Sequence, residues 1–303
     1  MASGRMEFHA ESIMQHANFS YVLPYDTPMP EVKEPKYYER DPKTLILLHG
    51  LTGTDTDWLF GGIAQIMSIH YNLAIFMPTT GNSFYLDKGY EGGNNATFVG
   101  EELPDFINKV FGFCESRENT LIGGLSMGGY GAFHTAFAYP ERFSAVIGLS
   151  NAIVFDSVME RFEREGLLGA VDDAKKENAP TISRYAGGKE ENDADAGKEE
   201  PDPIGDELST GMLLDVFGDP KTLRGSDRDL EATFLKLKKA HPELLPMIYM
   251  AIGTEDVLLD ANRQFAGFLK ENGADVTYEE GPGIHDWVFW NEYINRGIKS
   301  ILG

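Results

Sequence analysis

Ser126 stands in the segment GGLSMGGYGAF, where small residues surround one polar side chain. The apolar run before it predicts a strand, and the residues after it have the composition of a helix. A G-x-S-x-G motif between a strand and a helix is typical of a sharp turn that exposes a nucleophilic serine. Small neighbours keep such a strained turn free of collisions with adjacent backbone. The alternative is a glycine-rich turn with no chemical role.

A serine hydroxyl needs a base, and an acid that orients the base, before it can attack a carbonyl group. His285 is the best base among the seven histidines, because it lies in a Gly/Pro turn after the last predicted strand. For the acid, Asp256 follows a buried strand and is preferred over its neighbour Glu255. Asp260 is expected to cap the next helix. The sequence therefore predicts a triad of Ser126, Asp256 and His285.

The negative oxygen that forms during such an attack needs two backbone N–H donors. One is expected from Met127, directly after the serine. The other is expected from the loop HGLTGTDTDW, with Leu51 as first choice and Thr52 as second. His49 opens this loop, and we expect it to shape the loop rather than to act as the base.

Aromatic side chains near these segments are candidate walls of a substrate pocket. If several of them line the site, an aromatic acyl group such as a hydroxycinnamate is expected to fit. The candidates are Trp58, Phe84, Tyr85, Phe155, Trp287 and Trp290.

Short apolar runs alternate with helical segments and would place these residues on one scaffold. Almost wholly apolar runs indicate strands that are covered on both faces, as in a parallel sheet. The alternation predicts an α/β fold with a mostly parallel central sheet flanked by helices. Strands are expected at 44–50, 72–79, 119–125, 143–150, 246–253 and, at an edge, 275–281, after an antiparallel lead-in at 5–12 and 18–24. Helices are expected near 60–70, 100–116, 128–139, 260–272 and 288–301.

The alternation breaks after the sixth predicted strand. The core is expected to comprise residues 1–151 and 245–303, and residues 152–244 are expected to form a helical cap. The acidic stretch 185–207 inside this insertion predicts a mobile loop, because it has little apolar surface to bury. Its segment DADAG resembles part of a calcium loop, but Gly197 comes one position early, so we expect a solvated loop and no metal site.

Composition excludes several partners. The formal net charge of -22 argues against binding to nucleic acid or to an anionic membrane surface. No apolar run is long enough to span a bilayer, and the N-terminal residues lack a signal-peptide core, so a cytoplasmic location is expected. The single Cys114 lies at helical spacing with the apolar residues before it and is expected to be a buried bystander. A homo-oligomer is compatible with the sequence.

The motifs LLHGLTGTDTDW, FMPTTGNSFY, EELPDF, GGLSMGGYGAF, VFGD, AIGTEDVLLDANRQF and GIHDWVFW resemble the esterase D or putative esterase family of α/β-hydrolases. Within that family the chain is most similar to the bacterial tributyrin esterases. The resemblance runs from about residue 40 to the C-terminus, apart from the acidic stretch. It implies an α/β-hydrolase fold, a catalytic triad that follows the chain order Ser126, Asp256 and His285, and oxyanion donors at Leu51 and Met127. It implies no cofactor.

The residues and the resemblance together predict a serine carboxylesterase. It would hydrolyse short-chain acyl or hydroxycinnamoyl esters through an acyl-serine, and its small-molecule substrate would derive from plant polysaccharides. An S-formylglutathione hydrolase or an acyltransferase on the same scaffold is the alternative. A non-catalytic binding protein is the more remote one, since no triad residue is missing.

Overall fold

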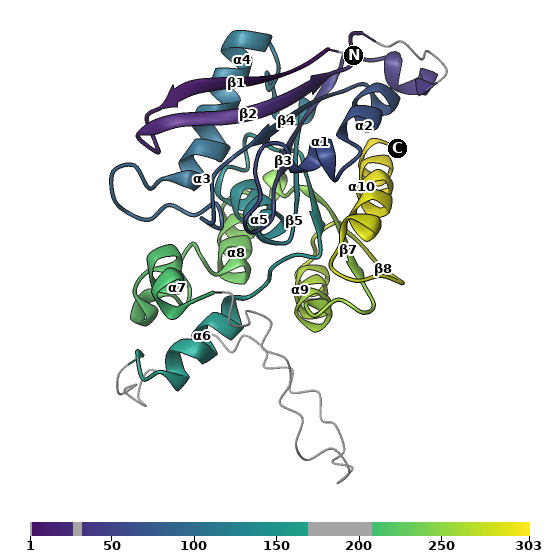
Figure 1. Cartoon of the computed structure of the whole chain (residues 1–303). Coiled ribbons are helices and arrows are strands. Elements are labelled where there is room, and N and C mark those ends of the chain that lie inside the picture. Colours follow the sequence, from purple (N-terminus) through teal and green to yellow (C-terminus); the bar gives the residue numbers. More distant parts are fainter. Residues whose placement is uncertain (1, 27–31, 169–207) are drawn as a thin grey trace.

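A single eight-stranded sheet forms the centre of the computed structural model, which describes residues 2–26, 32–168 and 208–303 (Figure 1). The strand order is β1-β2-β4-β3-β5-β6-β7-β8. β1 and β2 form an antiparallel hairpin, and β2 pairs antiparallel with β4. All other pairs are parallel. The strands are β1 Ala2–Ala10, β2 Gln15–Leu23, β3 Lys43–Leu48, β4 Leu73–Pro78, β5 Thr120–Leu125, β6 Ala145–Leu149, β7 Met247–Gly253 and β8 Val276–Gly281.

Burial explains this arrangement. Nearly every residue of β3 to β7 is buried, whereas β1 alternates between half-buried and exposed residues and β8 has only one buried residue. Strands with apolar side chains on both faces need helices on both sides, so they occupy the centre. The predicted mostly parallel sheet, its antiparallel lead-in and its edge strand are thus confirmed.

Helices cover the two faces of the sheet (Figure 1). α1, α2 and α10 pack on one face, and α4, α5, α8 and α9 belong to the apolar core of the other face. The α-helices are α1 Asp57–Phe60, α2 Ala64–Tyr71, α3 Asn95–Thr97, α4 Leu103–Phe111, α5 Met127–Ala138, α6 Phe155–Arg164, α7 Thr210–Phe217, α8 Leu230–Ala240, α9 Leu259–Glu271 and α10 Trp287–Leu302. A π-helical turn spans Phe98–Glu102, and 3-10 turns span Pro35–Tyr38, Arg117–Asn119, Pro220–Thr222 and Pro242–Leu244.

The expected helix near 100–116 is shorter and less regular than its apolar spacing suggests. Pro104 lacks an N–H group, and the turn before it is π-helical rather than α-helical. The helix ends at Gly112, whose φ of 72° is left-handed. Cys114 therefore lies beyond the helix, which corrects its predicted place in it. The thiol is nevertheless partly buried against the core, and burial raises its pKa to about 12.

Among the described residues between β6 and β7, where the insertion was predicted, there are three α-helices, α6, α7 and α8. α8 contacts α5 and α9, so it lies beside the sheet layer, and α6 contacts α7 further out (Figure 1). The acidic stretch 185–207 and the segment DADAG lie outside the described residues. The division of the chain at 152 and 244 stays a prediction.

None of the described helices combines the length and the apolar character that a bilayer crossing requires. The same described ranges contain no group of three or more His, Cys, Asp or Glu side chains placed to hold a metal ion. The cytoplasmic location and the homo-oligomer stay predictions.

Candidate active site

Ser126 occupies a strained turn between β5 and α5. Its φ of 54° and ψ of -121° lie in a region that residues with a Cβ atom rarely adopt. Backbone hydrogen bonds hold it there, because its N–H donates to the Leu149 carbonyl at 2.9 Å and its carbonyl accepts from Gly129 and Ala152. The side chain is half-buried at the carboxyl end of β5.

The glycines of the G-x-S-x-G motif are required by close backbone contacts. A Cβ atom on Gly128 would lie 2.5 Å from the carbonyl oxygens of Leu48 and His49, at the end of β3. One on Gly124 would collide with the Gly128 carbonyl. The start of α5 therefore packs directly on the backbone of β3 and β5, and only glycine fits at these two positions of the motif.

Asp256 and His285 meet at the carboxyl ends of the parallel strands, where Ser126 also lies. His285 follows β8 and its Nδ1 lies 2.8 Å from Asp256 Oδ2, after β7. The other carboxylate oxygen accepts from the Leu258 N–H at 2.9 Å. Asp256 is only 5% exposed, which by itself raises its pKa, but the hydrogen bond and charge of His285, with Leu258 and the Ser150 hydroxyl, lower the pKa below its usual range. A carboxylate on Nδ1 leaves Nε2 as the ring nitrogen that can accept a proton.

The two rival acids have other partners. The Glu255 carboxylate accepts from the Gly283 N–H at 2.7 Å and thereby ties the loop after β7 to the loop that carries His285. Asp260 does not cap α9, whose N-cap residue is Leu258; it lies in the first turn with an 86% exposed side chain, 3.4 Å from Arg263. Glu255 thus has a contact that positions the His285 loop, and no sequence motif marks this contact.

The serine and the histidine are not hydrogen-bonded to each other in this structure. Across the described residues the Ser126 hydroxyl has no hydrogen-bond partner, and the only side chain bonded to the His285 ring is Asp256. Ser126, Asp256 and His285 follow β5, β7 and β8, whose parallel strands end at one edge. Catalytic hydrogen bonds often tighten only when substrate is bound.

The loop after β3 passes close to the serine. A Cβ atom on Gly50 would lie 3.5 Å from the Cβ of Ser126, so the backbone here is within reach of a substrate on the serine. The Thr52 N–H donates to Asn82 Oδ1 at 2.7 Å and is therefore occupied. The Leu51 and Met127 N–H groups have no hydrogen-bond partner among the described residues, which favours Leu51 over Thr52 as the donor from this loop.

His49 has a structural environment. It is 1% exposed, its Nδ1 lies 2.7 Å from the Gly50 carbonyl and its Nε2 accepts from the Thr80 N–H at 3.2 Å. Burial lowers the pKa of the ring. Both ring nitrogens are thus engaged in holding the loop, as expected from the sequence.

Most of the predicted pocket aromatics lie in the core. Trp58, Phe84, Tyr85, Phe155 and Trp290 are all buried, and only Trp287 is partly exposed. The indole N–H of Trp58 donates to the Leu48 carbonyl and the Tyr85 hydroxyl donates to the His49 carbonyl. These contacts support the backbone beneath the site. Apolar spacing in the sequence does not separate such residues from a pocket wall.

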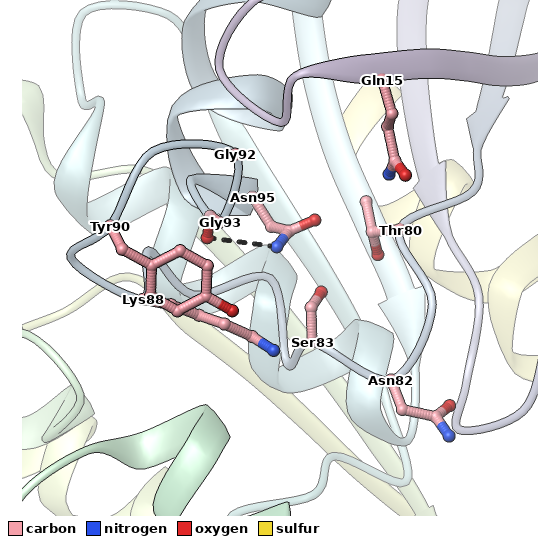
Figure 2. Close-up of a pocket in the computed structure, with 9 residues that line it drawn as sticks. All are labelled: Gln15, Thr80, Asn82, Ser83, Lys88, Tyr90, Gly92, Gly93 and Asn95. Atoms are coloured by element: carbon pink, nitrogen blue, oxygen red, sulfur yellow. Dashed lines mark hydrogen bonds between the residues drawn. The ribbon is translucent and has the colours of Figure 1, made fainter.

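A polar pocket of about 200 Å³ lies at the loop after β4, and none of the six aromatics lines it. Two of its lining residues, Thr80 and Asn82, are hydrogen-bonded to the loop after β3. Figure 2 shows the polar ends of Ser83, Lys88, Tyr90 and Asn95 turned toward one another. Lys88 forms an ion pair with Asp215 of α7, so one wall is tied to the insertion. The other residues that line it are Gln15, Thr80, Asn82, Gly92 and Gly93. The sequence did not predict this pocket: Thr80, Asn82 and Ser83 lie in the motif FMPTTGNSFY, but the motif does not show that they meet residues 15 and 88–95 around a cavity.

Comparisons with known proteins agree with one another. Residues 29–301 match the family model described as putative esterase. The acetyl esterase of Caldicellulosiruptor saccharolyticus is 36% identical over 304 residues, which cover 99% of this chain and 97% of that protein. Among solved structures, the substrate-bound fluorophosphonate-binding serine hydrolase F of Staphylococcus aureus has a TM-score of 0.71 at 23% identity and covers 100% of this chain and 98% of its own. A ferulic acid esterase has a TM-score of 0.63 at 19% identity, and the match covers 100% of this chain and 98% of that esterase. The fold is that of the α/β-hydrolase esterases.

Proposed function

The chain belongs to the putative esterase family and hydrolyses carboxylic esters of small molecules, and we propose that it does so with Ser126 as nucleophile, His285 as base and Asp256 as the acid that orients the base. The observation that carries this proposal is the 2.8 Å contact between His285 Nδ1 and Asp256, at the sheet edge where the strained Ser126 turn also lies. A buried carboxylate on Nδ1 fixes the ring and stabilises its charged form.

The reaction then proceeds in two halves. Ser126 attacks the ester carbonyl and its proton passes to His285 Nε2, while the Leu51 and Met127 N–H groups stabilise the negative oxygen. His285 returns that proton to the leaving alcohol as the C–O bond breaks. In the second half His285 takes a proton from water, the hydroxyl adds to the acyl-serine, and the acid leaves with Ser126 reprotonated.

Short acyl groups are the favoured substrates. The acetyl esterase relative supports this choice, and so does the burial of five predicted pocket aromatics, which leaves their rings little surface to offer a bulky acyl group. Hydroxycinnamoyl esters are the second choice. The pocket in Figure 2 supports an alcohol part with several hydroxyl groups, as in a plant-polysaccharide fragment, because amides and hydroxyls line it.

The insertion 152–244 is proposed as a cap beside this pocket. The ion pair between Lys88 and Asp215 supports this arrangement, because it joins the loop after β4 to α7. A second hydrogen bond joins the insertion to α5 of the core: the Tyr130 hydroxyl donates to the Arg228 carbonyl at 2.6 Å.

The test is hydrolysis of p-nitrophenyl esters from acetate to octanoate, with methyl ferulate and a glutathione thioester as further substrates. Ser126→Ala and Asp256→Asn should lower kcat by about 10⁴-fold or more. Asp260→Asn is the matched control, since its carboxylate is exposed, and should keep wild-type kcat. The wild type should prefer acetate.

Labelling with a fluorophosphonate and intact-mass measurement provide a second readout. The adduct should form on the wild type and be absent from Ser126→Ala. Equal hydrolysis by the wild type and Ser126→Ala would overturn the proposal. Transfer of the acyl group to an added alcohol in preference to water would instead favour the acyltransferase.

A further inference from the structure

Ser150 is a buried polar residue that the proposed mechanism does not use. It follows β6, is fully buried and has a φ of 45°, a left-handed value that is costly for a residue with a Cβ atom. Its N–H donates to the Ala251 carbonyl at 2.8 Å, which fixes the backbone. A strained serine where glycine would fit more easily indicates that the hydroxyl is needed.

Trp290 contacts both this serine and the proposed base. Its indole N–H donates to Ser150 Oγ at 3.1 Å, and its ring meets the His285 ring edge-on, with centroids 5.0 Å apart and planes at 87°. Trp290 is 7% exposed in the first turn of α10, which Asp286 caps by accepting from the Phe289 N–H at 3.0 Å. The indole is thus held by packing and by the helix that carries it.

The direction of the indole hydrogen bond determines what Ser150 can do. Trp290 can only donate, so Ser150 Oγ is the acceptor and its own proton remains available. The Asp256 carboxylate can accept it, since His285 and Leu258 supply one donor to each of its oxygens. In agreement, the Ser150 hydroxyl is one of the groups that lower the pKa of Asp256.

We propose that Trp290 and Ser150 are positioning residues for the Asp256–His285 pair. Trp290 packs against the imidazole and fixes the Ser150 hydroxyl, which in turn supports the ionised carboxylate. Neither residue touches the substrate. This inference rests on the proposed triad, and it assigns Trp290 a role other than the predicted one of a pocket wall.

Two variants separate the two contacts. Trp290→Phe keeps an aromatic ring and removes the N–H donor, and Ser150→Ala removes the hydroxyl. Each should lower kcat about tenfold and change KM less than twofold. The double variant should be no worse than the more impaired single one, because both changes break one chain of contacts. Matched controls are Tyr293→Phe, one turn further along α10, and Ser144→Ala, before β6; both should keep wild-type kcat.

The pH dependence provides a readout that a merely structural role would not change. A hydroxyl that donates to ionised Asp256 opposes protonation of the pair, so its loss should move the acidic midpoint of the kcat/KM profile to higher pH. The other titratable side chains on these loops are Glu255, which accepts from Gly283, and Asp286, which caps α10. We expect both to keep these partners in the variants.

Wild-type kcat and an unchanged acidic midpoint in either folded variant would overturn the inference. Circular dichroism shows which variant is folded, and Ser150→Ala removes only one atom should Trp290→Phe fail to fold. Ser126→Ala is measured in parallel. Wild-type activity in Ser126→Ala would refute the proposed triad, whereas a strongly impaired Ser126→Ala beside normal Trp290→Phe and Ser150→Ala would refute only this inference.

Discussion

Asn262 links two loops of the site through four buried hydrogen bonds. Its Oδ1 accepts from the backbone N–H of Asn151 at 3.2 Å and from Asn151 Nδ2 at 2.9 Å. Its Nδ2 donates to the carbonyls of Asn151 at 2.7 Å and Leu258 at 3.0 Å. Both asparagines are fully buried. Substitution of Asn262 by alanine removes all four bonds with little loss of apolar contact.

The loss in free energy of unfolding depends on which buried polar groups are left without any hydrogen-bond partner. The Asn151 carbonyl still accepts from Ile153, and the Leu258 carbonyl still accepts from the backbone N–H of residue 262. The two Asn151 donors have no other acceptor among the described residues. At about 1–3 kcal/mol for each buried donor left unpaired, Asn262→Ala should lower the free energy of unfolding by about 4 kcal/mol. This is a large part of a typical stability of about 5–15 kcal/mol.

Urea unfolding followed by far-UV circular dichroism measures this loss. Asn119→Ala, at an exposed position, is the control and should change the free energy of unfolding by less than about 0.5 kcal/mol. Activity should fall as well, because the Leu258 N–H holds Asp256. A loss of less than about 1 kcal/mol with an unchanged urea slope would refute the reasoning.

Three further predictions concern buried groups. Gly128→Ala places a Cβ atom 2.5 Å from backbone carbonyls at the end of β3 and should lower the free energy of unfolding by about 3 kcal/mol. In the control Gly267→Ala, in α9, the added Cβ atom meets nothing within 4 Å, so the substitution should raise Tm. A thermal melt in which Gly128→Ala were the more stable of the two would contradict the packing. Burial lowers the pKa of His134 to about 4, so the unfolded chain binds a proton that the folded chain rejects between about pH 6.5 and 4, and stability falls as the pH drops through that window. His134→Leu should remove that part of the pH dependence of the urea midpoint and exposed His241→Gln should not; parallel pH curves for the wild type and His134→Leu would show the linkage to be wrong. Cys114, with its pKa raised to about 12, should resist iodoacetamide at pH 8 until urea unfolds the chain, and rapid labelling of the folded protein would show the thiol to be accessible.

Local sequence patterns determined the scaffold of this protein. Apolar runs of strand length identified the buried strands, because residues covered on both faces must be apolar whatever their partners are. The G-x-S-x-G motif identified the serine turn, because its glycines avoid contacts that lie within a few residues or at the end of one neighbouring strand. His285 was identified as the base because it lies in the loop between the last predicted strand and the last predicted helix.

The tertiary structure alone decided which side chains meet. Asp256 and Glu255 are adjacent in sequence, and only the turn after β7 directs one to His285 and the other to the Gly283 N–H. Burial likewise decided that most of the predicted pocket aromatics belong to the core. The contacts of Ser150 with Trp290 and of Asn151 with Asn262 join residues 140 and 111 positions apart. No local pattern records such pairs, because it is the order of strands in the sheet that brings distant loops to one edge.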